Sequence, residues 1–226
     1  MTNILAIETS SDACSIALCK RDEDFLFHDV MPQQHTKKLL PLVDEMLINQ
    51  DLSYQNLDAI AVGCGPGSFT GVRIGLATVK GLAEILSKPI LAVTTFEAWA
   101  QKAFKWRGTV VPLIDARRNE VYARVFERND NCLIQRKPDW VGSPEKFLQT
   151  LDSKSILFLG DGAEKYDELI RSEGLSSWEI AETDLYLGRS LVSIVNSKEY
   201  SQKWSQPEEI FPYYLRKSDA EMKWSG

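Results

Sequence analysis

Histidine is scarce in this sequence: only His28 and His35 occur among 226 residues, and they lie seven positions apart. Two imidazoles one helical turn apart commonly hold a divalent metal, and this spacing does not provide that arrangement. We therefore expect no metal site built on a histidine pair, and we assign neither histidine a catalytic role.

Paired cysteines and long apolar runs are missing too. The four cysteines show no C-x-x-C spacing, and three lie among aliphatic residues or glycines, so we expect free thiols. No run approaches the ~20 apolar residues that span a bilayer. The first apolar segment contains Glu8 and follows no basic region, so it predicts a strand, not a signal peptide, and we expect a cytoplasmic protein with no membrane contact.

Positive charge is in deficit, because the formal net charge is −6. Non-specific affinity for nucleic acid comes from Lys and Arg that neutralise phosphates. We therefore expect any link to RNA to be indirect.

The apolar pattern that is present predicts an α/β protein. Short apolar segments at residues 4–8, 14–19 and 25–30 predict a three-stranded meander, followed by an amphipathic helix at 36–49. A strand at 57–62, a helix at 70–86, a strand at 89–93 and a helix from 95 follow. This βββαβα order resembles one lobe of the actin-like ATPase (ASKHA, ribonuclease H-like) fold. We expect an N-terminal lobe at 1–104 and a smaller, reduced repeat at 105–226, with strands at 109–115, 120–127, 132–137 and 155–159.

A glycine-rich loop, Gly65-Pro66-Gly67-Ser68-Phe69-Thr70-Gly71, joins the predicted strand to the helix at 70–86. Unpaired amides at a helix N-terminus can bind a phosphate, and the turns Glu8-Thr9-Ser10 and Gly160-Asp161-Gly162 could serve similarly. The alternative is a tight turn that needs glycine whether or not anything binds. The loop is not a Walker motif, because Lys80 lies nine residues after Gly71.

The helix at 70–86 is apolar or small nearly all the way round, whereas a surface helix should have one polar face. Either its second face packs on the neighbouring helix of its own lobe, or a partner protein covers it. We favour the partner. The residues that we expect at this interface are apolar or small positions of the first two helices: Leu39, Leu42, Val43, Met46, Val72, Gly75, Leu76 and Val79.

The chain resembles the TsaB (YeaZ) family, the partners of TsaD in making threonylcarbamoyladenosine beside the tRNA anticodon. The resemblance runs almost end to end. Its motifs are Ile4 to Ala17, Gly71-Val72-Arg73-Ile74-Gly75, Lys80-Gly81-Leu82-Ala83, Ile114-Asp115-Ala116-Arg117 with Glu120-Val121-Tyr122, and Pro212-Tyr213-Tyr214-Leu215-Arg216.

The resemblance implies a non-catalytic subunit that binds and activates a TsaD-like enzyme, alongside a TsaE-like ATPase, and that forms a homodimer when alone. TsaD-like proteins carry two metal-binding histidines where this chain has Thr95 and Trp99. We therefore expect no required cofactor, with at most weak or interfacial ATP or ADP binding.

Two alternatives belong to other classes of function. An actin-like ATPase or phosphotransferase could use Glu8, Asp115 and Asp161 as carboxylates for a metal. A peptidase would need an activated nucleophile, and the Gly-x-Ser-x-Gly elbow is absent around Ser68.

Overall fold

The computed structural model describes residues 3–11, 13–20, 24–30, 35–129, 132–182, 184–197, 200 and 203–216, and for residues 24–30 and 35–38 it describes the backbone alone. The chain forms two compact units: Met1–Ala98 with Leu185–Tyr213, and Trp99–Asp184 with Tyr214–Gly226. No helix in the described part of the chain is both long enough and apolar enough to cross a bilayer.

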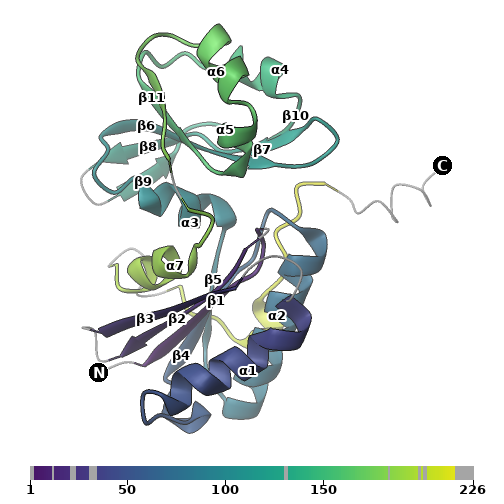
Figure 1. Cartoon of the computed structure of the whole chain (residues 1–226), viewed down its shortest axis with the longest axis vertical. Helices are drawn as coiled ribbons and strands as arrows, with labels where there is room; N and C mark the ends of the chain where they lie inside the picture. Colours follow the sequence, from purple (N-terminus) through teal and green to yellow (C-terminus); the bar gives the residue numbers. More distant parts are fainter. Residues whose placement is uncertain are drawn as a thin grey trace, which may run out of the picture. The chain divides into compact units, whose positions relative to one another are not determined.

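The first unit is built on a five-stranded sheet of order β3-β2-β1-β4-β5 (Figure 1). The strands β1, β2 and β3 form the expected antiparallel meander, and β4 and β5 extend it in parallel with β1. Its elements in the described part of the chain are β1 (Ile4–Glu8), β2 (Cys14–Lys20), β3 (Asp24–Val30), α1 (His35–Ile48), β4 (Ala59–Gly63), α2 (Phe69–Leu86), β5 (Ile90–Val93), α3 (Thr95–Lys102, which ends in the second unit) and α7 (Gly188–Val195), with 3₁₀ turns at Tyr54–Asn56 and Pro207–Glu209. The predicted βββαβα order is confirmed.

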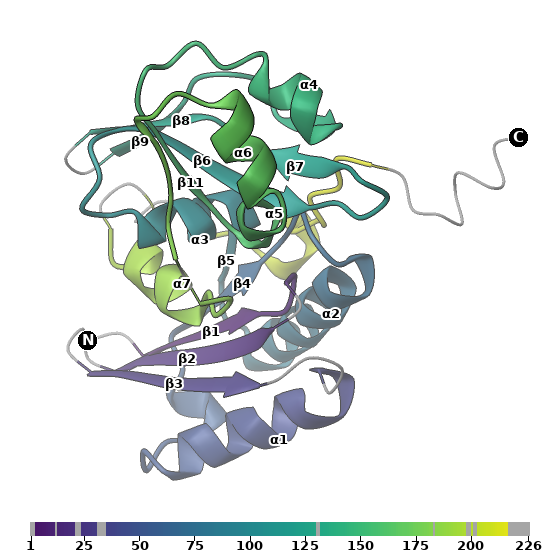
Figure 2. The ribbon, with the colours of Figure 1, turned by 45° about the horizontal axis from the view of Figure 1, so that its top comes forward.

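The two faces of this sheet carry side chains of different size. Large aliphatic residues such as Leu5, Ile16 and Ile60 form one core with α1 and α2. The opposite face carries small residues such as Ser15 and Ala17, and α7 packs closely on it. Figure 2 shows α1 and α2 on one side of the strands and α7 on the other. Because successive side chains of a strand point to opposite faces, the large residues line one face and the small residues line the other, where a helix can pack closely.

The helix α7 changes the expected division of the chain at residue 104. Residues Leu185–Tyr213 belong to the first unit, not to the second. The physical reason is the small face of the sheet, where the Ser15 hydroxyl oxygen accepts the backbone N–H groups of Leu187 at 3.1 Å and Gly188 at 2.7 Å. These bonds satisfy donors at the start of α7 that have no partner within the helix.

The second unit has a seven-stranded sheet with a main order of β10-β7-β6-β11-β12, to which β8 and β9 are added beside β6. Its elements are β6 (Gly108–Asp115), β7 (Val121–Ala123), β8 (Phe126–Asn129), β9 (Cys132–Gln135), β10 (Trp140–Gly142), α4 (Pro144–Leu148), β11 (Ile156–Leu159), α5 (Asp161–Lys165), α6 (Asp167–Glu173) and β12 (Trp178–Ile180). The single strand expected at 120–127 is two strands, because Pro112 of β6 has no N–H to donate to the ladder between them.

Candidate functional site

The glycine loop and the turn after β1 lie in direct contact with each other. The backbone N–H of Ser68 donates to the carbonyl of Ser10 at 2.7 Å, and the Thr9 hydroxyl donates to the carbonyl of Gly71 at 2.8 Å. A Cβ on Gly67 would lie 2.3 Å from the Ser10 carbonyl oxygen, and one on Gly71 would lie 1.9 Å from that of Thr9. These glycines therefore admit the chain's own turn at the start of α2.

This contact involves two of the turns that we considered for phosphate binding. Thr9, Ser10 and Gly67 come together, and the carbonyl of Ser10 accepts one of the unpaired donors at the start of α2, the Ser68 N–H. Gly65 adopts a φ of 102°, which glycine tolerates best. In the second unit Gly160 and Gly162 also lie against backbone, since a Cβ on either would lie within 2.7 Å of the Leu113 carbonyl oxygen. The turn at 160–162 thus packs against the end of β6.

Glu8 is a fully buried carboxyl at the end of β1. Its Oε1 accepts the Ser10 backbone N–H at 2.8 Å and the Ser10 hydroxyl, which is also bonded to Thr95 Oγ1 at 2.8 Å. Among the described residues its Oε2 has no hydrogen-bond partner, and Gly63 leaves the space that the carboxyl fills. Burial raises the pKa of Glu8, against the lowering effect of these hydrogen bonds. The neutral form that burial favours is a poor ligand for a divalent cation.

The other two carboxylates considered for a metal already have partners on the chain. Asp115 pairs with Lys165 and Arg117, and Asp161 accepts the backbone N–H groups of Asp115 and Gly162. Within the described residues, His, Cys, Asp and Glu side chains form no group of three that could hold a metal ion. The side chains of His28 and His35 lie outside the described part.

The predicted interface residues occupy a different place from the one expected. Seven of them are buried within the first unit, and Leu42 is half-buried against the same core: the seven are Leu39, Val43, Met46, Val72, Gly75, Leu76 and Val79. They face the bulky side of the sheet. The apolar pattern identified the two helices correctly but did not distinguish the side that packs on the sheet from the side that is exposed.

The exposed side of these helices mixes apolar or small residues with charged ones, such as Asp44 and Glu45 of α1. Ile85 is 83% exposed, Ile48 is 71% exposed and Leu40 is 44% exposed. Within the described part of the chain, a Cβ added to Gly81 would meet no atom within 4 Å, so no contact there requires glycine at this position. We give the name outer face to the following exposed or half-buried residues: Leu40, Asp44 and Ile48 of α1 with Thr70, Arg73, Ile74, Ala77, Thr78, Gly81, Glu84 and Ile85 of α2.

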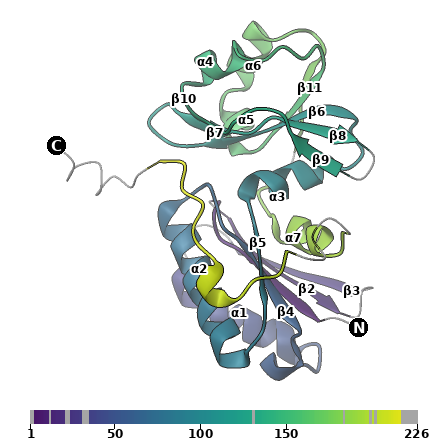
Figure 3. The ribbon, with the colours of Figure 1, turned by 180° about the vertical axis from the view of Figure 1, so that it is seen from behind.

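A segment that we call the strap, residues 203–213, lies along α2 (Figure 3). Ser205 pairs with Ile90 of β5, the Lys80 ammonium donates to the carbonyl of Ile210 at 2.9 Å, and the N–H of Tyr213 donates to the carbonyl of Cys64 at 2.7 Å. Sequence reasoning missed the strap. The motif Pro212–Arg216 was the available signal, but its sequence does not show where it packs.

Comparisons with known proteins find related sequences over most of the chain. Residues 29–224 match the family model described as "TsaD: tRNA N6-adenosine threonylcarbamoyltransferase". A TsaB protein of Haemophilus influenzae is 35% identical, over 94% of this chain and 93% of its own. The Escherichia coli TsaB protein is 32% identical over 99% of this chain and 98% of its own.

The chain belongs to the TsaB family. The YeaZ structure from Pseudomonas aeruginosa superposes with a TM-score of 0.82 at 30% identity, covering 95% of this chain and all of that one. Another structure from that organism, equally similar in fold, is described as having similarity to peptidase YEAZ. The curated TsaB relatives are named as tRNA threonylcarbamoyladenosine biosynthesis proteins.

In this TsaB-family chain, the positions compared with the TsaD histidines are structural. Thr95 is 1% exposed and its hydroxyl contacts Ser10, whereas Trp99 is 1% exposed and ranks among the large buried side chains. Neither side chain is a usual metal ligand. Thr95 instead connects the start of α3 to the buried carboxyl of Glu8 through Ser10.

Proposed function

We propose that this chain acts in tRNA threonylcarbamoyladenosine biosynthesis as a non-catalytic subunit that binds and activates a TsaD-like enzyme through its outer face. The observation that carries the proposal is Gly81, a glycine in a helix interior whose Cβ position is open. Such a glycine destabilises a helix by about 1 kcal/mol relative to alanine. Since no neighbouring atom among the described residues requires a glycine at this position, its presence needs another reason. Close approach of a partner helix supplies one.

The order of residues along α2 indicates how a partner helix would lie. Arg73, Ala77, Gly81 and Glu84 follow one another at helical spacing along the outer face, with the cation near the start and the acid near the end. In an antiparallel pair of such helices, Arg73 would lie opposite the acid of the partner and Ala77 opposite its small residue. A partner of the same fold, related by a two-fold or pseudo-two-fold axis, fits this pattern.

The position of Arg73 is already constrained in the single chain. Its guanidinium lies 4.0 Å from the centre of the Phe69 ring, which is a cation–π contact. The side chain therefore loses less conformational freedom when a partner carboxylate binds it. We propose that the TsaD-like subunit occupies this face, and that a second copy of the chain occupies it when that subunit is absent.

Two further parts of the proposal concern tRNA binding and nucleotide hydrolysis. The acidic net charge assigns most of the tRNA binding to other subunits. The contact between Thr9–Ser10 and the glycine loop argues against an ATPase acting alone, so a TsaE-like ATPase would supply nucleotide hydrolysis. We further propose that the chain requires no cofactor and that it acts in the cytoplasm with the other subunits.

Reconstitution tests the proposal. Threonylcarbamoyl transfer to tRNA is measured with TsaD-like and TsaE-like subunits, with this chain omitted, added, or added as Ala77→Arg. We expect transfer to fall to the level without the chain for Ala77→Arg, because an arginine prevents close helix approach. Ser176→Arg, which adds the same charge at an exposed turn of the second unit, should keep full activity.

Substitutions on the buried side of α2 are unsuitable for this test. Gly75→Arg and Val79→Asp would place large or charged groups in the core, since Val79 is fully buried and Gly75 abuts Thr9. Both would unfold the first unit and remove activity for a trivial reason. Equal transfer with Ala77→Arg and with the unmodified chain would refute the proposed interface.

A further inference from the structure

The hairpin between β6 and β7 has an unusual backbone. Arg117, Arg118 and Asn119 have φ values of 61°, 55° and 59°, so three consecutive residues without a glycine adopt the left-handed conformation. Residues other than glycine adopt it at an energetic cost and normally one at a time. Strain of this kind persists only where the surroundings hold it, and it concentrates at functional sites.

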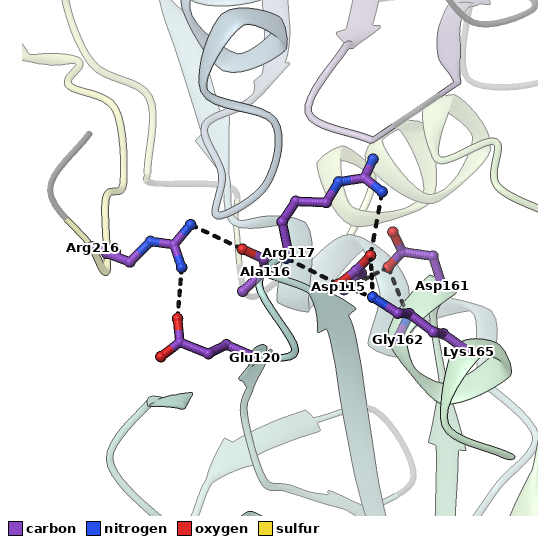
Figure 4. A network of polar contacts seen from close by, with 8 residues as sticks. All are labelled: Asp115, Ala116, Arg117, Glu120, Asp161, Gly162, Lys165 and Arg216. Atoms are coloured by element: carbon purple, nitrogen blue, oxygen red, sulfur yellow. Dashed lines mark hydrogen bonds and ion pairs between the residues drawn. The ribbon is translucent and has the colours of Figure 1, made fainter. Parts of the chain in front are cut away.

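One side of the hairpin is held by Asp115. Its carboxylate accepts the Arg117 backbone N–H at 2.9 Å, the Arg117 guanidinium at 3.3 Å and the Lys165 ammonium at 3.0 Å (Figure 4). The hydrogen bond to Asp115 raises the pKa of Lys165, so the amine remains charged. Burial of the acid with exposure of the cations leaves positive charge at the surface: the Asp115 side chain is 7% exposed and that of Arg117 is 64% exposed.

The other side of the hairpin is held by Arg216. Its guanidinium donates to Glu120 Oε2 at 2.6 Å and to the Ala116 carbonyl at 2.9 Å (Figure 4). Two motifs that the sequence comparison singled out, at 114–122 and at 212–216, therefore meet at this hairpin. The function proposed above uses neither of them.

The hairpin tip, defined as Arg117, Arg118 and Asn119, is exposed, contains no acid, and belongs to a chain whose net charge is −6. Guanidinium groups match phosphate oxygens in a two-pronged geometry, which lysine does not. Small-molecule sites are concave, whereas an exposed hairpin tip suits an extended polyanion. Glycine at these three positions would relieve the backbone strain, and the sequence has two arginines and an asparagine there instead.

We propose that the hairpin tip contacts the phosphate backbone of an RNA strand. The assignment to RNA, over an acidic protein segment, rests on the proposed function, in which the substrate is a tRNA. It adds a local, direct contact to the otherwise indirect link with RNA. The contact is independent of base sequence, because phosphates carry no sequence information.

Fluorescence anisotropy with a labelled tRNA anticodon stem-loop tests the proposal, with the full chain alone and in complex with the TsaD-like subunit. We expect Arg118→Gln to weaken binding about tenfold, the loss of one charge-assisted contact. The slope of log affinity against log salt should become shallower by about 0.7 to 0.9. Arg118→Lys should keep the slope but bind more weakly, whereas the matched control Arg136→Gln, an exposed arginine elsewhere in the second unit, should change neither.

Three results would overturn the assignment. Equal losses of RNA affinity in Arg118→Gln and Arg136→Gln would show that the overall charge of the chain, not the hairpin tip, determines binding. Displacement of the RNA by ATP at matched ionic strength would assign the tip to a nucleotide. Loss of co-elution with the TsaD-like subunit in Arg118→Gln, with RNA binding intact, would make the tip a protein contact. Co-elution of Ala77→Arg is measured in parallel, so failure of the outer face is distinguished from failure of the tip.

Discussion

Replacing Gly81 by alanine should stabilise the protein, whereas replacing Gly75 by alanine should not. Both residues lie inside α2, and both changes add one methyl group. Alanine is favoured over glycine in a helix interior by about 0.8 to 1.0 kcal/mol, and this gain is common to the two variants. Any difference between them therefore comes from what the new Cβ meets.

At Gly81 the new Cβ meets nothing within 4 Å, so we expect the full gain of about 1 kcal/mol. At Gly75 it would lie 2.3 Å from Thr9 Oγ1, which donates to the Gly71 carbonyl. The Thr9 hydroxyl would have to rotate away and lose that buried hydrogen bond, at a cost of about 1 to 3 kcal/mol. Gly75→Ala should therefore range from neutral to about 2 kcal/mol less stable.

Urea unfolding of the full chain, followed by circular dichroism, gives the free energy of unfolding of each variant. The account predicts that Gly81→Ala exceeds Gly75→Ala by about 1 to 3 kcal/mol at similar m-values. Equal stabilisation of both variants would show that the turn at Thr9 does not press on α2.

Three further predictions concern the turn, the buried acid and the hairpin. Gly71→Ala places a Cβ 1.9 Å from the Thr9 backbone carbonyl, so it should lower the free energy of unfolding by about 3 kcal/mol in the same urea assay. The pKa of Glu8 is raised in the folded state above its ordinary value of 4.5, so the folded chain holds this proton more tightly than the unfolded chain does. The free energy of unfolding should therefore fall as the pH rises from 4.5 through the folded-state pKa. Glu8→Gln has no proton to lose and should show a flatter profile of urea midpoint against pH, and parallel profiles would contradict this. Arg118→Gly should raise stability by about 0.5 kcal/mol, since relief of left-handed strain exceeds the entropy that glycine adds to the unfolded chain. A lower urea midpoint would instead indicate that the arginine side chain is needed for folding.

Local pattern was sufficient to predict the strand and helix order from β1 to α3. Short alternating segments separated by turn residues predicted β1 to β3, and spacing at three and four residues predicted α1. The break between β7 and β8 was not predicted. It lies opposite Pro112, and which residues lie opposite a proline is known only once the strands are paired. Long-range pairing decides such breaks.

The orientation of α2 could not be predicted from sequence, since Gly75 and Gly81 look alike in a helix that is small or apolar all round. Only the tertiary structure separates them, with Thr9 against the first and open space beside the second. The position of α7 is a similar case. Ser15 and Ala17 on β2 were a usable signal for close packing on that face, but nothing local to residues 188–195 indicates the partner.

The measurement that tests the central claim most directly is isothermal titration of a TsaD-like subunit into this chain and into two variants. The account predicts saturable binding by the unmodified chain and by Ser176→Arg, and no measurable heat of binding with Ala77→Arg, whose urea midpoint remains near that of the unmodified chain. Binding by Ala77→Arg with an unchanged Kd would contradict the assignment of the outer face as the partner interface.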